Sequence, residues 1–252
     1  GTNIGMAQVA RAAPDGYTVG LASIAANAAN KWLYRSLPFD PDRDFAAVGM
    51  IALVPNIVVI PPSVPAQDLQ QFIAWARAQN RPINFGSVGA GSSQHLAGSQ
   101  FQMITGLPMQ HLPYTNSGQM NTDLMEGRID MLFQSISAVT QLAQAGRMRP
   151  IAVSGADRVG AFPNLPTMRE QGVEIVSTGW FGLCTPAGVP EPILARLEAT
   201  LGAVMEEPEL RDRIIAGGSV PRRMGRVDFA RFMQEESERW RVVIQAVGAR
   251  AD

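Results

Sequence analysis

Short apolar segments alternate with amphipathic ones through the middle of the chain, and this alternation restricts the folds open to it. The predicted strands lie at 83–85, 109–112, 129–133 and 149–153, and the predicted helices at 68–78, 117–126 and 136–145. Strands that alternate with helices of this length predict a parallel or mostly parallel sheet with helices on both faces. The predicted fold class is therefore α/β.

The segments on either side of this block are read in the same way. Asn3 begins a predicted helix at 3–12, and residues 17–23 read as a buried strand. The apolar run at 47–60 is broken by Pro55, which predicts two consecutive strands. A second uninterrupted apolar strand is expected at 179–184, and everything from Pro190 onward is expected to be helical.

The segment 83–98 (INFGSVGAGSSQHLAG) reads as a strand, a glycine-rich loop and a helix that begins near Ser92 or Ser93. Its glycines allow positive φ and a close approach of the backbone to a bound group. Serine is a good helix N-cap, and a helix start offers unpaired N–H groups and the positive end of a dipole. The segment therefore predicts an anion site. A tight turn between strand and helix without a ligand is the alternative interpretation.

The kind of anion follows from what the segment lacks. It fails the dinucleotide fingerprint because Gln94 stands where the third glycine belongs, and no Gly-Lys-Ser/Thr sequence follows. Lys31 is the only lysine in the chain. Hydroxyls and backbone amides without a lysine suit a small carboxylate better than a triphosphate.

Composition excludes several classes of function. The 252 residues carry a formal net charge of −1, which argues against nucleic acid or an anionic membrane as a partner. The single cysteine, Cys184, rules out an internal disulfide and a cysteine metal cluster. His95 and Ser93 are two apart and do not face each other on a helix, and His111 is expected to be a packed or hydrogen-bonded strand residue. No metal, no cofactor and no catalytic constellation is expected, and no apolar run is long enough for direct membrane insertion.

Two further features have both a structural and a functional interpretation. Asn27 and Asn30 lie among small residues after the early strand, where they can cap a helix or line a cleft. Trp180 reads as a core residue or as a ligand-stacking aromatic.

Several motifs together resemble the solute receptors of tripartite tricarboxylate transporters, also called Bordetella uptake gene receptors. They are NIGMAQVARAAPDGYT at 3–18, LPFDPDRDF at 37–45, NFGS at 84–87 with GSS at 91–93 and HLAG at 95–98, LPY at 112–114, Gly127, FPNLPT at 162–167, WFG at 180–182 and PAG at 186–188. They follow the family's order over nearly the whole chain.

The resemblance implies a two-lobed periplasmic binding protein of type II, a Venus flytrap with two hinge-crossing strands. We expect lobe I at 1–54 and 180–252 and lobe II at 55–179, because the two long apolar strands bracket the alternating block. In the family a strand, a glycine-rich loop and a helix precede the first motif, and we expect them to be absent from this chain. The resemblance also implies a periplasmic location. The chain opens at Gly1 without methionine, so no signal peptide is expected in it, and a monomer is expected.

The resemblance also implies a set of ligand-binding residues in the cleft between the lobes. They are Ser23, Ala25 and Asn27 on the early loop, Ser87, Gly91, Ser92 and Ser93 on the glycine loop, Thr115, Asn116 and Ser117 at a helix start, and Gln134 and Trp180. The family often has a basic residue and glycine where this chain has Thr115 and Asn116, and often aspartate in place of Gln134. Neutral residues at these positions put the usual ligand preference in doubt.

Three functions follow as hypotheses. The first is an extracytoplasmic receptor that captures a small carboxylate, which can be a di- or tricarboxylate, an amino acid or an aromatic acid, by backbone amides and hydroxyls. It would deliver the ligand through transient contact with membrane transporter subunits. The second is a ligand sensor of the same fold that feeds a two-component signalling system. The third is an enzyme on this fold, which the lack of a catalytic constellation disfavours.

Overall fold

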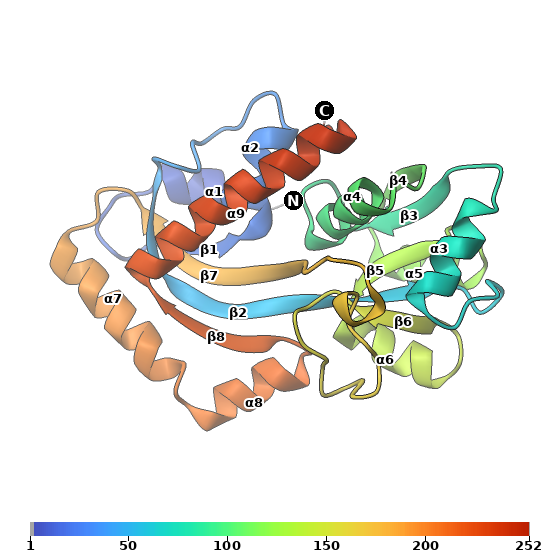
Figure 1. Cartoon of the computed structure of the whole chain (residues 1–252). Helices are drawn as coiled ribbons and strands as arrows, with labels where there is room; N and C mark the ends of the chain where they lie inside the picture. Colours follow the sequence, from blue (N-terminus) through green and yellow to red (C-terminus); the bar gives the residue numbers. More distant parts are fainter. Residues whose placement is uncertain (1–2, 252) are drawn as a thin grey trace. The chain divides into compact units, whose positions relative to one another are not determined.

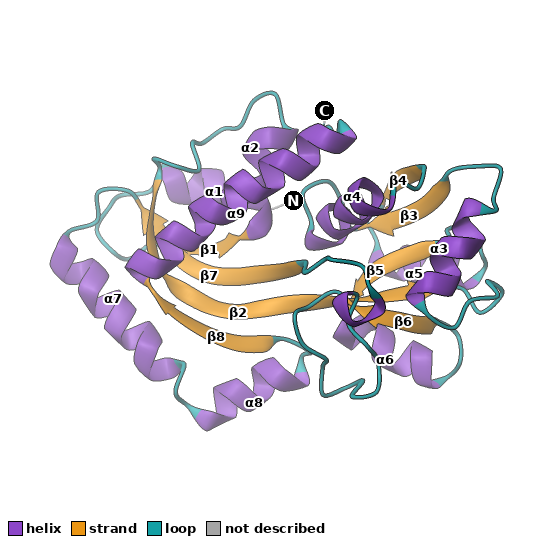
Figure 2. Cartoon of the chain, viewed as in Figure 1, coloured by secondary structure: helices purple, strands orange, loops and turns teal. Residues whose placement is uncertain are grey.

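A computed structural model describes residues 3–251, and it is an α/β structure (Figures 1 and 2). Gly1, Thr2 and Asp252, which the expected lobe boundaries include, lie outside the described residues. The chain divides into two compact units. Unit 1 comprises 3–53, 179–245 and 249–251, and unit 2 comprises 54–178 and 246–248. No helix among the described residues combines the length and the apolarity needed to cross a membrane.

Unit 1 is a small antiparallel sheet with helices. Its elements are α1 (Asn3–Ala10), β1 (Gly20–Ser23), the π-helix η1 (Ala25–Ala29), α2 (Asn30–Leu33), the first part of β2 (Phe45–Ile60), β7 (Thr178–Pro186), α7 (Glu191–Val204), α8 (Pro208–Ala216), β8 (Val220–Gly225) and most of α9 (Arg226–Val247). β1 pairs with β7, and β8 pairs with β2, both antiparallel. In Figure 1 β8, drawn in red-orange, runs beside the blue β2.

A buried carboxylate organises the core of unit 1. Glu236 on α9 is buried, and its Oε2 accepts the indole N–H of Trp180 and that of Trp240 at 3.2 and 2.9 Å. Its Oε1 accepts a hydrogen bond from Arg239 at 3.0 Å. A buried carboxylate is stable only with such partners, so these bonds fix α9 against β7.

Unit 2 contains a mixed sheet that positions the glycine loop. Its elements are the second part of β2, α3 (Leu69–Arg77), β3 (Ile83–Ser87), α4 (Ser93–Thr105), β4 (Met109–Pro113), α5 (Ser117–Met125), β5 (Met131–Ser135), α6 (Ile136–Gln144), β6 (Arg149–Val153) and the 3-10 helix η2 (Arg169–Gln171). β3 is parallel to β4 and β5, whereas β2 is antiparallel to β5 and β6. The expectation of a mostly parallel sheet holds for β3, β4 and β5 and is wrong for β2, which enters the sheet in the opposite direction.

The second part of β2 is buried on both faces, because helices cover both sides of the unit 2 sheet. Val58 and Ile60 pack in one cluster with Phe72 of α3 and Phe101 of α4. Ile57 and Val59, on the opposite face of the strand, pack in a second cluster with side chains from α5 and α6. Helices on both faces agree with the prediction from the alternating segments.

The structure corrects two further expectations. Residues 45–60 form one strand instead of two, although Pro55 lies inside it. The register of β2 with β8 ends at Leu53, and the registers with β5 and β6 begin at Asn56 and Ile57, so none of these three ladders needs the missing N–H of Pro55. The region after Pro190 is not all helical, since β8 interrupts it. The local pattern of β8, with proline and two arginines, is typical of an edge strand and carries no apolar alternation.

Replacing the buried Ser154 by alanine should destabilise the protein by about 1–3 kcal/mol. Its hydroxyl accepts the Asn56 N–H at 2.9 Å and donates to the Ser177 carbonyl at 2.6 Å, so alanine leaves both groups buried without a partner. Urea unfolding followed by circular dichroism measures the change. Ser137→Ala, the same change at an exposed position of α6, is the control. Equal stability of the two variants would contradict the assignment.

Candidate ligand-binding site

The glycine loop joins β3 to α4 in unit 2, and its shape depends on two glycines. Gly89 and Gly91 have φ of +123° and +78°, which side-chain-bearing residues rarely adopt. Ser92 is the N-cap of α4: its hydroxyl accepts the His95 N–H at 3.2 Å and donates to the Gly89 carbonyl at 2.8 Å. The helix therefore begins at Ser93, as predicted.

The donors of the loop divide into engaged and open ones. The Gly91 N–H donates to Nδ1 of His95 at 3.2 Å, and the Ser92 N–H donates to the Gly89 carbonyl at 3.3 Å. The N–H groups of Ser93 and Gln94 and the Ser93 hydroxyl have no hydrogen-bond partner among residues 3–251. Gly91 and Ser92 thus support the loop, and the open donors lie at Ser93 and Gln94.

Two histidines lie together beneath the loop, a pairing that sequence reasoning missed. The rings of His95 on α4 and His111 on β4 have centroids 4.1 Å apart, and both contact the Phe85 ring. Nε2 of His111 is 2.6 Å from the Ser87 hydroxyl, which also bonds the N–H and carbonyl of Gly89. The strand register that places His111 beside Phe85 brings the rings of His95 and His111 together, and no spacing in the sequence predicts this pairing.

Both histidines are held neutral. Burial, with a smaller effect of the neighbouring His111, lowers the pKa of His95 to about 3. Burial lowers the pKa of His111 to about 4. The neutral form of His95 is also the one that can accept the Gly91 N–H. Among residues 3–251 no group of three histidine, cysteine, aspartate or glutamate side chains is arranged to hold a metal.

Gln134, at the end of β5, is buried and belongs to a chain of side-chain amides. Its Oε1 accepts Nε2 of Gln94 at 2.8 Å, and its Nε2 donates to Oδ1 of Asn121 at 2.9 Å. Gln94 in turn accepts the N–H of Val88 in the glycine loop at 2.9 Å. The structure therefore places Gln134 under the loop, and it adds Asn121 and Gln94 as candidate site residues that the sequence did not single out.

The predicted ligand-binding residues at the start of α5 lie next to the end of β3. The Tyr114 N–H donates to the Ser87 carbonyl at 2.8 Å. Asn116 is the N-cap of α5, and its Oδ1 accepts two backbone N–H groups of the first turn. Thr115 and Ser117 are exposed beside it. Asn116 is thus engaged as a cap, whereas the two hydroxyls are open to solvent.

The predicted unit 1 residues gather at the end of β1. Asn27, in the π-helix η1, accepts the Ser23 N–H on Oδ1 at 3.0 Å, and Ala25 opens that helix. Nδ2 of Asn27 and Oδ1 of Asn30 are buried without a hydrogen-bond partner in the described chain. Neither asparagine caps a helix with its side chain, and single-turn π-helices occur frequently at functional sites.

Trp180 does not fit its predicted role as a ligand-stacking aromatic. Its side chain is 1% exposed, packs edge-on against Phe229 and Phe232, and donates its indole N–H to Glu236. The packing of α9 over β7 buries the ring completely. Trp180 is therefore a core residue of unit 1, and we remove it from the set of ligand contacts.

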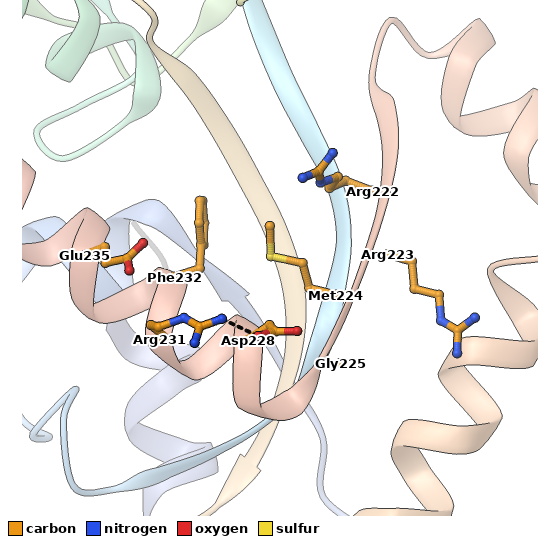
Figure 3. Close-up of a pocket in the computed structure, with 8 residues that line it drawn as sticks. All are labelled: Arg222, Arg223, Met224, Gly225, Asp228, Arg231, Phe232 and Glu235. Carbon is orange, nitrogen blue, oxygen red and sulfur yellow. Dashed lines mark hydrogen bonds and ion pairs between the residues drawn. The ribbon is translucent and has the colours of Figure 1, made fainter.

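Unit 1 also contains a pocket of about 490 Å³ between β8 and α9 (Figure 3). Met224 and Phe232 line its apolar part, and Arg222 lies at its edge. Arg231 pairs with Asp228, whereas Arg223 points away from the other side chains and pairs with Glu206. All three arginines are exposed, and Asp228 and Glu235 also line the pocket, so it offers a solvated rim of mixed charge.

Comparison with known proteins gives this arrangement a context. Residues 1–249 match the model of the tripartite tricarboxylate transporter family receptor, TctC. The chain belongs to this receptor family. BugT of Bordetella pertussis is 30% identical over 249 residues, which cover 98% of this chain and 76% of BugT.

Solved structures agree with the family assignment. Rpa4515 of R. palustris, determined with adipate, has a TM-score of 0.88 and 32% identity, over 98% of this chain and 83% of that chain. MatC (Rpa3494) of Rhodopseudomonas palustris, with bound malate, has a TM-score of 0.83 and 26% identity, over 96% of this chain and 84% of that chain. The fold is thus that of a periplasmic binding protein. Proteins of this family are solute-binding receptors in the periplasm and not enzymes.

The histidine pair should make the receptor less stable in mild acid. In the unfolded chain both histidines bind a proton near their ordinary pKa of 6.5, whereas in the folded protein they do so only near 3 and 4. The free energy of unfolding should therefore fall as the pH is lowered from about 7 through 6.5 toward about 4. The chain has two histidines, and aspartate and glutamate titrate mainly below about pH 5, so the range from about 7 to 5.5 isolates them.

Urea unfolding at several pH values measures this slope. His111→Gln should flatten it, because one of the two protons no longer binds on unfolding. A wild-type stability that does not change over this range would show that the histidines are not held neutral.

Proposed function

We propose that this receptor captures a small carboxylate and that the glycine-loop edge of unit 2 holds one carboxylate group. The observation that carries the proposal is the set of open donors at Ser93 and Gln94. They lie at the start of a helix of 13 residues, where the dipole favours an anion. The loop that presents them is fixed by hydrogen bonds from beneath, so little ordering is needed on binding.

Neutral donors are sufficient for this task. Residues 87–93 contain no lysine or arginine. A hydrogen bond to a charged acceptor contributes roughly 1.5–3 kcal/mol, so two or three preorganised donors can hold a carboxylate without a cation. The adipate and malate bound to two relatives are both dicarboxylates, which supports this ligand class for the present chain.

Unit 1 supplies a second candidate donor. The buried Nδ2 of Asn27 lacks a partner, and we include Asn27, with Ser23 and Ala25, among the residues proposed to contact the ligand. We also propose that the two compact units are the two lobes expected from the sequence. The receptor acts as a periplasmic monomer in this proposal and delivers its ligand to the membrane subunits of its transporter.

Replacing Ser93 by alanine should weaken carboxylate binding by about tenfold or more, because it removes an open hydroxyl donor while leaving the cap at Ser92 in place. Isothermal titration calorimetry, with the best ligand from a thermal-shift panel of carboxylates, measures the change. At a hundred times its dissociation constant that ligand should stabilise the wild type by about 2.7 kcal/mol. Ser137→Ala serves as the matched control. Unchanged affinity of Ser93→Ala would remove the helix start from the site.

Binding at the glycine loop should depend only weakly on salt and should survive Arg222→Ala. Exposed arginines attract an anion through charge, which salt screens, whereas short hydrogen bonds from partly buried neutral donors are screened much less. Affinity measured at about 0.02 and 0.5 M sodium chloride distinguishes the two cases. A steep salt dependence that disappears in Arg222→Ala would instead place the ligand in the unit 1 pocket of Figure 3.

A further inference from the structure

A chain of three side-chain amides runs from the glycine loop to helix α5. The Val88 N–H donates to Gln94, Gln94 donates to Gln134, and Gln134 donates to Asn121, at 2.9, 2.8 and 2.9 Å. Gln94 and Gln134 are 7% and 1% exposed, so the hydrogen bond between them is shielded from water. Asn121, at the other end of this row of amides, is half-buried.

Two backbone N–H groups fix the direction of every amide in this chain. A backbone N–H can only donate, so the Val88 N–H requires the oxygen of Gln94 to face it. The Ser135 N–H, at 2.9 Å, requires the same of the oxygen of Gln134. Each glutamine must then turn its nitrogen to the next residue. Gln94 meets the oxygen of Gln134, and Gln134 meets the oxygen of Asn121.

The consequence falls on Asn121. Because the Asn121 side-chain oxygen accepts from Gln134, the Asn121 Nδ2 is the last donor in the row of amides and is left over. That nitrogen has no hydrogen-bond partner in the part of the chain that the structure describes, and the side chain is accessible to solvent. Asn121 therefore offers an N–H donor, and rotation of its amide to offer the oxygen would place two N–H groups against each other at Gln134.

We propose that Asn121 Nδ2 donates to the ligand and that Gln134 is the positioning residue that keeps it a donor. This rests on the proposed function, because Gln134 lies near the end of β5, and β5 pairs with β3, the strand that leads into the glycine loop. The inference concerns the class of ligand. A site edge with open N–H groups at Asn121, Ser93 and Gln94 accepts a carboxylate and repels an ammonium group. The ligand class is a carboxylate without an amino group next to the bound carboxylate.

The test compares ligands that differ only in that amino group. Succinate and adipate are titrated against their 2-amino counterparts, aspartate and 2-aminoadipate, by calorimetry at pH 7.5. The wild type should prefer the amino-free member of each pair. Asn121→Ala should weaken succinate or adipate roughly ten- to a hundredfold and weaken the 2-amino ligand less, so that the preference shrinks.

Variants of Gln134 test the positioning role. In Gln134→Glu both carboxylate oxygens accept, so Asn121 must turn its nitrogen inward and present its oxygen, and the preference should reverse toward the 2-amino ligand. Gln134→Met carries no charge and leaves Asn121 free to rotate, so the preference should shrink without reversing. If the buried glutamate of Gln134→Glu prevents folding, Gln134→Met still tests the positioning role. Gln141→Glu adds the same charge at an exposed position of α6 and should leave the preference unchanged.

Failure of this inference is distinguishable from failure of the proposed function. A wild type that binds no member of a broad carboxylate panel contradicts the proposed function, and the inference falls with it. A wild type that binds carboxylates but shows no preference within the pairs overturns the inference alone. The inference alone is also overturned if Asn121→Ala and Gln134→Met both keep the wild-type preference within about twofold, a difference of about 0.4 kcal/mol.

Discussion

Backbone N–H groups that leave water must have acceptors, and this requirement shapes the glycine-loop edge of unit 2. Where the chain leaves β3 it loses the ladder bonds of the sheet, and the N–H groups of Val88 and Gly91 need other partners. Side chains from the first turn of α4 supply them, since Gln94 accepts one and His95 the other. The same helix turn therefore holds the loop with its side chains and keeps its own first N–H groups open. Rigidity of the loop and availability of the donors have a common origin.

The acceptors beneath the loop also have to be uncharged. An aspartate or glutamate in place of Gln94 or His95 would accept these N–H groups more strongly, but it would put a negative charge next to the proposed carboxylate. An amide and a neutral imidazole accept without charge. Burial keeps the pKa of His95 and His111 far below neutrality, so this condition holds across the physiological range. The first turn of α4 thus holds the glycine loop in place without putting a negative charge beside the proposed carboxylate.

Local sequence patterns predicted most of the fold because most elements here have strong local signals. The α3, α4 and α5 helices, the cap at Ser92 and the glycine loop all appear where they were expected. Patterns failed where tertiary pairing decides: β8 has no apolar alternation and is a strand only because β2 pairs with it. The histidine pair and the Gln94–Gln134–Asn121 chain depend on strand register and helix placement. For the same reason Trp180 looked like a ligand contact, although the partners that bury it lie on α9.

The magnitudes limit what the glycine loop can do alone. Three donors to one carboxylate contribute roughly 5–9 kcal/mol, against an association cost of about 4 kcal/mol or more. The difference corresponds to weak binding, since a micromolar dissociation constant requires about 8 kcal/mol net. The remainder has to come from the rest of the ligand, at about 0.8 kcal/mol for each buried methylene and more for a second polar group. In the proposed site the loop and Asn121 would therefore select the head group, and surfaces beyond them would determine chain length and affinity.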